Sequence, residues 1–135
     1  MSLKQRQDWA YHVAKAGLVK CTQRVEGVGM KWTVPSRTNV SGMEFHTVKR
    51  IGLNQFKCWL ENPLSNGTGS PCKGNRHPNA GVCQHVMAVV TDEMLRQGRR
   101  AVFWLTEEDA ERQSRPMFHV NGEAGGVWVS HRKGG

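Results

Sequence analysis

The sequence predicts an α+β fold: a β-β-β-α core with one helix before it and a strand, a short helix and a hairpin after it. Three observations lead to this prediction: helical spacing of apolar residues at the N-terminus, two-residue alternation between residues 30 and 60, and an apolar helical run after residue 83. At 135 residues the chain suits a single domain spanning 1–135, with its core at about 30–98.

An N-terminal helix is expected to start after Ser2, because Ser2 and Gln5 have the spacing of a capping box. Apolar residues then recur at helical spacing, and Gly17 is a suitable stop. These residues are Trp9, Ala10, Val13, Ala14 and Ala16. The apolar face is modest, so we expect this helix to pack against the rest of the chain.

Three short strands are expected between residues 30 and 60, joined as an antiparallel meander. The alternating sets are Trp32 and Val34, then Met43, Phe45 and Thr47, and finally Phe56, Cys58 and Leu60. In the middle stretch the intervening Glu44, His46 and Val48 make the alternation less clean. The segment Asn39–Gly42 suits a hairpin connection between the first two strands.

Four further elements are expected after residue 83. They are a buried helix at 86–95 ending near Gly98, a strand at 101–105, a helix from Thr106 to Arg112, and a hairpin of 117–120 with 127–129. Asp109 stands three residues after Thr106, at the capping-box position, which supports the short acidic helix.

Residues 61–82 are rich in Pro, Gly, Ser and Asn and predict a long loop. A loop of more than about 20 residues inside a compact domain needs a physical reason. Disorder is one explanation. The alternative that we favour is a metal ion bound at Cys72, because it would shorten the effective loop on both sides.

Four residues are predicted to hold one zinc ion: Cys58, Cys72, Cys83 and His85. Three cysteines and one histidine are a common structural zinc set, and without a secretory signal we expect a reducing compartment in which disulfides are rare. Cys83 and His85 can share a metal if Cys83 precedes a helix and His85 lies in its first turn, where the helix N-terminus favours the thiolate. Cys58 is expected at a strand end. The alternative is buried cysteines with an unrelated histidine.

These residues resemble the SWIM zinc finger, a β-β-α unit whose signature is Cys-x-Cys, a variable gap and Cys-x-His. The similar stretches, within residues 30 to about 95, are Trp32–Ser36, Phe45–Val48, Phe56–Cys58 and Cys83–Val89. The chain departs from the signature at Leu60, where the second cysteine would stand, and Cys72 is expected to replace it after a loop insertion. His77 competes with Cys72 for that role. The resemblance implies a SWIM-like core that binds DNA or protein.

The composition favours a polyanionic partner, because 19 Lys and Arg against 11 Asp and Glu give a formal charge of +8. We therefore expect nucleic-acid binding, with DNA preferred to RNA. The candidate contacts are Lys49, Arg50, Lys57, Lys73, Arg76, Arg96, Arg99 and Arg100, and Trp59 and Trp128 could stack on bases if exposed. The alternatives are an adaptor for an acidic protein and a basic surface with no partner.

The sequence does not predict an enzyme. It contains no glycine-rich phosphate loop, nucleophile elbow or His-Glu-x-x-His helix. Cys21 is most simply a small core or surface thiol. A zinc site with three protein ligands and an open position would revive the enzyme alternative. No apolar run approaches the roughly 20 residues of a membrane span, and we expect a cytoplasmic or nuclear protein that is not secreted.

Overall fold

The computed structural model describes residues 2–24, 29–35, 45–61, 70–71, 82–113, 116–122 and 125–133. These residues form three helices and eight strands. In chain order they are α1 (Leu3–Lys15), β1 (Lys20–Gln23), β2 (Lys31–Pro35), β3 (Phe45–Gly52), β4 (Gln55–Glu61), β5 (Ser70–Pro71), α2 (Gln84–Arg96), β6 (Arg99–Trp104), α3 (Glu107–Glu111), β7 (Met117–Gly122) and β8 (Gly125–Lys133). The predicted α+β class is confirmed.

The strands form one sheet in the order β1-β2-β3-β4-β7-β8-β6, with β5 paired to β4. The predicted meander is confirmed, because β2, β3 and β4 pair antiparallel in sequence order. The C-terminal hairpin and β6 continue the same sheet, through a parallel contact in which Gln55 is opposite Asn121. The Asn121 amide donates to the Asn54 carbonyl oxygen across this junction at 2.8 Å.

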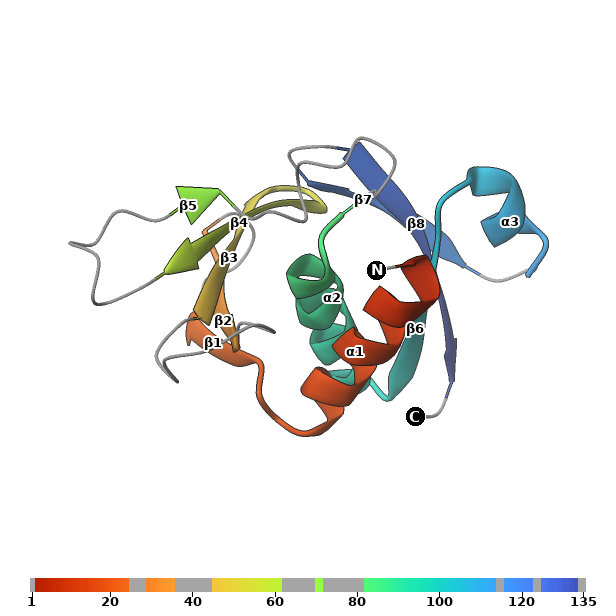
Figure 1. Cartoon of the computed structure of the whole chain (residues 1–135). Helices are drawn as coiled ribbons and strands as arrows, with labels where there is room; N and C mark the ends of the chain where they lie inside the picture. Colours follow the sequence, from red (N-terminus) through yellow and green to blue (C-terminus); the bar gives the residue numbers. More distant parts are fainter. Residues whose placement is uncertain are drawn as a thin grey trace.

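The sheet curls around the two long helices, and α2 lies between β2–β4 on one side and β6–β8 on the other (Figure 1). Eight consecutive residues of α2, from His85 to Asp92, are buried. An amphipathic surface helix would bury only one stripe, so this pattern marks α2 as the central helix. Its apolar side chains share one hydrophobic cluster with Ala10 of α1, Trp32 of β2 and Val129 of β8.

The helix starts follow the predicted capping chemistry. At α1, Ser2 Oγ accepts from the Gln5 amide at 3.1 Å, and the Gln5 side chain accepts from the Ser2 amide at 2.9 Å. At α3, Thr106 Oγ1 accepts from the Asp109 amide at 3.3 Å. Gly17, predicted as the stop of the first helix, follows α1 with φ +74°, a conformation that glycine adopts without strain.

The face of β3 that packs against the helices differs from the predicted one. The pattern grouped Phe45 and Thr47 with the apolar sets, but the register places Val48 beside buried Trp32 and Cys58, and His46 on the same inner face. Side chains alternate along a strand, so Phe45 and Thr47 belong to the outer face. Cys58 lies in the middle of β4, so the predicted position at a strand end is wrong.

Two strands were not predicted, β1 and β5, and the predicted hairpin connection at Asn39–Gly42 lies outside the described residues. Of the predicted long loop, the described part is short: Glu61, Ser70–Pro71 and Val82. Among the described residues, no helix is long and apolar enough to cross a membrane.

The edge strand β6 is held from both sides. On one side, β8 pairs with it, and Arg99 Nη1 donates to His131 Nδ1 at 2.7 Å. On the other side, the Phe103 amide donates to the Gln7 side-chain oxygen of α1 at 2.6 Å. A guanidinium can only donate, so the contact requires His131 Nδ1 to be unprotonated. Burial, together with the positive charge of Arg99, lowers the pKa of His131.

We predict that His131 makes the fold less stable in acid. Its pKa is lower in the folded chain than in the unfolded chain, so the unfolded chain takes up the proton first as the pH falls below about 6.5. The free energy of unfolding should therefore decrease from that pH downward. Urea titrations at a series of pH values should show a shallower decrease for His131→Asn. His12→Asn, at an exposed position of α1, is the control for the loss of one imidazole.

Candidate metal centre

Three metal-binding side chains meet on the inner side of the sheet: His46 of β3, Cys58 of β4 and His85 of α2. Their possible ligand atoms all lie within 4.8 Å of one another, and all three residues are buried. The three come from separate elements, so an ion among them would tie two neighbouring strands to the start of the central helix.

The register of β3 and β4 explains how His46 and Cys58 come together. Val48 is opposite Cys58, and His46 is opposite Leu60. Residues two apart on a strand share a face, so His46 and Cys58 are diagonal neighbours on the inner face. Diagonal pairs of this kind are within reach of long side chains.

The start of α2 supplies the third side chain. The helix begins at Gln84 with Cys83 as its N-cap residue, which places His85 in the first turn. This confirms the local geometry predicted for Cys83 and His85. Cys83 is fully buried, and its charged form interacts favourably with the guanidinium of Arg6.

The two imidazole rings are stacked, with centroids 3.5 Å apart and planes 15° from parallel. Trp9 of α1 packs edge-on against His85, with ring centroids 5.6 Å apart. His46 is 6% exposed, and its Nδ1 atom is buried without a hydrogen-bond partner among the described residues. A buried polar nitrogen without a partner is costly, and a metal ion is one group that would satisfy it.

The donor set fits a metal of borderline softness. Imidazole nitrogen and thiolate sulfur are the usual ligands of zinc, which is tetrahedral in structural sites. The three described ligands would leave one position for a fourth. Buried His46, Cys58 and His85 could therefore hold a metal ion.

The predicted ligands have different outcomes. Cys58 and His85 lie in the cluster, whereas Cys83, although next to it in sequence, is not among the three grouped residues in the described part of the chain. Cys72 and its competitor His77 lie outside the described residues. Sequence reasoning did not select His46, although it stands in a stretch that resembles the finger. The signal that could have found His46 is its position along the strand. It lies two residues before Val48, which is opposite Cys58, so His46 and Cys58 are on the same face of the sheet.

The predicted nucleic-acid contacts that the structure describes lie on four elements, β3, β4, α2 and β6. Lys49 and Lys57 lie side by side on the outer face of the sheet. Arg50 donates to the Gly52 carbonyl oxygen at 3.3 Å. Arg96 pairs with Asp92 at 3.0 Å, which raises the pKa of Arg96. Lys73 and Arg76 lie outside the described residues.

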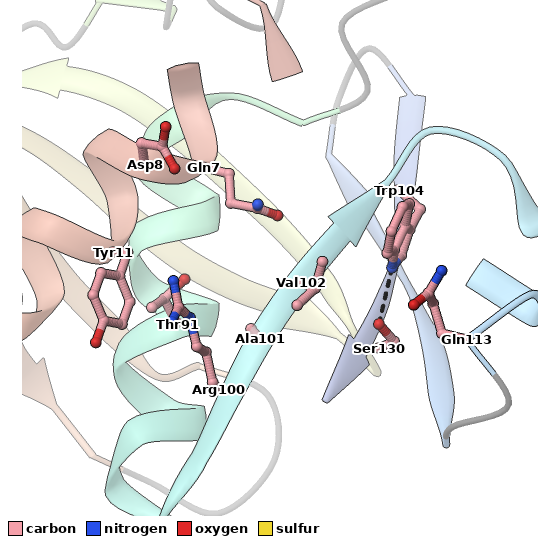
Figure 2. A pocket seen from close by; sticks show the side chains of 10 residues that line it. All are labelled: Gln7, Asp8, Tyr11, Thr91, Arg100, Ala101, Val102, Trp104, Gln113 and Ser130. Carbon is pink, nitrogen blue, oxygen red and sulfur yellow. Dashed lines mark hydrogen bonds between the residues drawn. The ribbon is translucent and has the colours of Figure 1, made fainter. Parts of the chain in front are cut away.

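Arg99 and Arg100 belong to β6, away from those lysines. Arg100 lies over the ring of Tyr11, 4.4 Å from its centroid. It also lines a polar cavity of about 300 Å³ between α1 and β6 (Figure 2). In the same cavity, Trp104 Nε1 donates to Ser130 Oγ at 2.9 Å. Arg100 thus has a structural contact within the fold.

Comparisons of the chain with protein-family models, with curated proteins and with solved structures give no match. The class of the protein is therefore described from its fold and its candidate metal site. It is an α+β protein with a curled sheet around a central helix and a buried His–Cys–His group that could hold a metal ion.

We predict that Arg6 positions the helix start beside the cluster. Arg6 is 6% exposed, and its Nη1 donates to the Val82 carbonyl oxygen at 2.6 Å. Burial lowers the pKa of Arg6, while the neighbouring Cys83 raises it. Arg6→Met removes the donor to Val82 and should lower the free energy of unfolding by about 1–3 kcal/mol. Denaturant titration measures this loss, and Lys4→Met, an exposed change in the same helix, should cost much less. Equal losses in the two variants would contradict a positioning role.

Proposed function

We propose that this protein is a zinc-stabilised binding module in which His46, Cys58 and His85 are metal ligands. The observation that supports this most directly is their convergence: three buried ligand atoms within 4.8 Å, from two strands and a helix start. The buried Nδ1 atom of His46 adds to it, because that nitrogen has no hydrogen-bond partner among the described residues.

Zinc is the metal that this donor set favours. Histidine and cysteine together suit zinc better than magnesium or calcium, which prefer oxygen ligands. The fourth ligand is a cysteine in our proposal, and the two candidates are Cys72 and Cys83. Cys83 is favoured by its place two residues before His85 and by the positive charge of Arg6 beside it, which stabilises a thiolate.

The role that we propose for the metal is structural. A catalytic ion keeps an open position that substrate can reach, whereas Cys58 is 1% and His85 is 2% exposed. An ion at this place would join β3 and β4 to the central helix, and its binding free energy would become folding free energy.

The proposed module is a variant of the SWIM type. The order of strand pair, Cys58, and Cys83-x-His85 at the start of an apolar helix supports this interpretation. Leu60 occupies the position of the missing second cysteine, and its partner across the strand pair is His46. In this variant, the ligand that the SWIM signature places at residue 60 of β4 would be replaced by His46, which lies opposite Leu60 on β3.

We predict one zinc ion per chain and a loss of thermal stability when a chelator removes it. His46→Ala, Cys58→Ala and His85→Ala should each weaken zinc binding more than about 100-fold, because even partners beyond the direct ligands contribute about 10- to 100-fold. The matched controls Cys21→Ser and His12→Ala should keep the metal. The measurements are elemental analysis, melting curves, and the thiolate-to-metal absorption of the cobalt-substituted protein. Wild-type protein that folds without metal and binds none would reject the site.

Single changes at Cys72 and Cys83 identify the fourth ligand. The cysteine that coordinates the metal should, when changed to Ser, alter the cobalt absorption and lower the zinc affinity, while the other change leaves both intact. If neither change has an effect, the fourth ligand is not a cysteine, and His77→Ala is the next test. If that change also leaves the zinc affinity and the cobalt absorption intact, the fourth position is open, and the enzyme alternative becomes the better explanation.

We further propose that the module binds nucleic acid. The formal charge of +8 supports a polyanionic partner. The alternatives are an adaptor for an acidic protein, which the same charge would also favour, and a basic surface with no partner.

We predict measurable binding to oligonucleotides that weakens steeply with salt. For about five phosphate contacts to a single strand, a fourfold rise in salt lowers the affinity roughly 100-fold. Fluorescence anisotropy of a labelled oligonucleotide at several salt concentrations measures this slope on the zinc-loaded chain. Absence of binding at about 50 mM salt would reject this function and favour the acidic-protein adaptor.

A further inference from the structure

Three lysines stand directly opposite one another across three neighbouring strands. Lys31 of β2 is opposite Lys49 of β3, and Lys49 is opposite Lys57 of β4. Neighbouring strands lie about 4.8 Å apart, so the three Cα atoms span about 10 Å in a straight row. We refer to Lys31, Lys49 and Lys57 as the lysine row.

The lysine row lies on the outer face of the sheet. In the adjacent register, Trp32, Val48 and Cys58 are buried against the core, so their neighbours along each strand point away from it. Lys57 is exposed, and Lys31 and Lys49 are half-buried. Both long helices lie on the other side of β1–β4, and no described helix covers the lysine row (Figure 1).

The lysine row concentrates positive charge on this half of the sheet. Strands β1–β4 contain five lysines and arginines and one acidic residue, Glu61. A polyanion lying along the row would therefore meet charge of one sign.

The next row on the same face adds an aromatic ring. Trp59 of β4 is opposite Thr47, which is opposite Thr33, which is opposite Lys20 of β1. Trp59 is half-buried, and two residues along a strand place it about 7 Å from Lys57. The face therefore combines four cationic positions with one indole ring.

We propose that this outer face binds single-stranded nucleic acid, with the lysine row contacting phosphates and Trp59 stacking on a base. This inference rests on the proposed nucleic-acid binding and names the surface responsible for it. A positively charged surface with an aromatic ring is the usual combination for a single strand. A duplex is read in its grooves by protruding elements, whereas this row lies across a sheet face, so the single strand is the better fit.

The test compares matched variants of the zinc-loaded full chain. The first, Lys31→Gln/Lys49→Gln/Lys57→Gln, removes the lysine row. The control, Lys4→Gln/Lys15→Gln/Arg112→Gln, removes three exposed cations elsewhere and lowers the net charge equally. The third, Trp59→Leu, removes the ring. The probes are a labelled dT oligonucleotide of about 12 nucleotides and the same oligonucleotide annealed to its complement, both measured by anisotropy at several salt concentrations.

We expect the lysine-row variant to lose at least about tenfold in affinity at low salt. Its salt slope should fall by about 2, since each phosphate contact with a single strand contributes about 0.7. The control should change by less than about threefold. Trp59→Leu should weaken binding about 5- to 100-fold with the slope unchanged, because stacking does not release counterions.

The stability of the variants separates a lost contact from a lost fold. The lysine-row variant should keep its zinc and a cooperative melting transition, because the three substitutions lie on the outer face and leave the hydrophobic core unchanged. Equal weakening by the lysine-row and control variants would overturn the inference while leaving nucleic-acid binding by net charge intact. Tighter binding of a duplex than of the single strand would also overturn it. Failure of the wild-type chain to bind either probe would instead reject the proposed function.

Discussion

The convergence of β3, β4 and the first turn of α2 is the contact on which the rest of the structure depends. His46, Cys58 and His85 meet there, and all three are buried. From that point α2 runs through the hollow of the sheet with eight consecutive buried residues. A shift of the helix start would therefore disturb the contacts of α2 with β2–β4 and with β6. Arg6, which donates to the Val82 carbonyl oxygen, and Trp9, which packs on His85, support the same point from α1.

Local signals in the sequence predicted most of the secondary structure. The Ser2–Gln5 capping box, the Thr106 cap and the alternation around Trp32 each depend on residues close together in the chain, and each matches the structure. The same local logic placed Cys83 before α2 and His85 inside it. Short-range rules succeed here because hydrogen bonds within three or four residues decide where a helix begins.

His46 escaped prediction for a physical reason. The stretch from Met43 to Val48 contains apolar residues at both parities, so its hydrophobic pattern did not identify the inner face. If the inner face of a strand is assigned one residue off, every side chain is placed on the wrong face. The prediction therefore placed His46 on the outer face, whereas the structure has it in the cluster. The partner strands resolve the parity, since Val48 is opposite both Trp32 and Cys58. The parallel contact of β4 with β7, a single pair at Gln55 and Asn121, has no comparable local signal.

The hydrogen bond between Gln7 and Phe103 has a consequence for how the chain matures on the ribosome. The two residues are 96 positions apart in sequence, and at a synthesis rate of about 5–20 residues per second they emerge roughly 5–20 s apart. For most of that interval α1, with only a modest apolar face, has neither α2, its main packing partner, nor β6 to dock against. Short isolated helices are marginally stable in water. The helix α1 is therefore made before the elements that cover it, so the nascent chain exposes the core-facing residues of α1 until α2 has been synthesised.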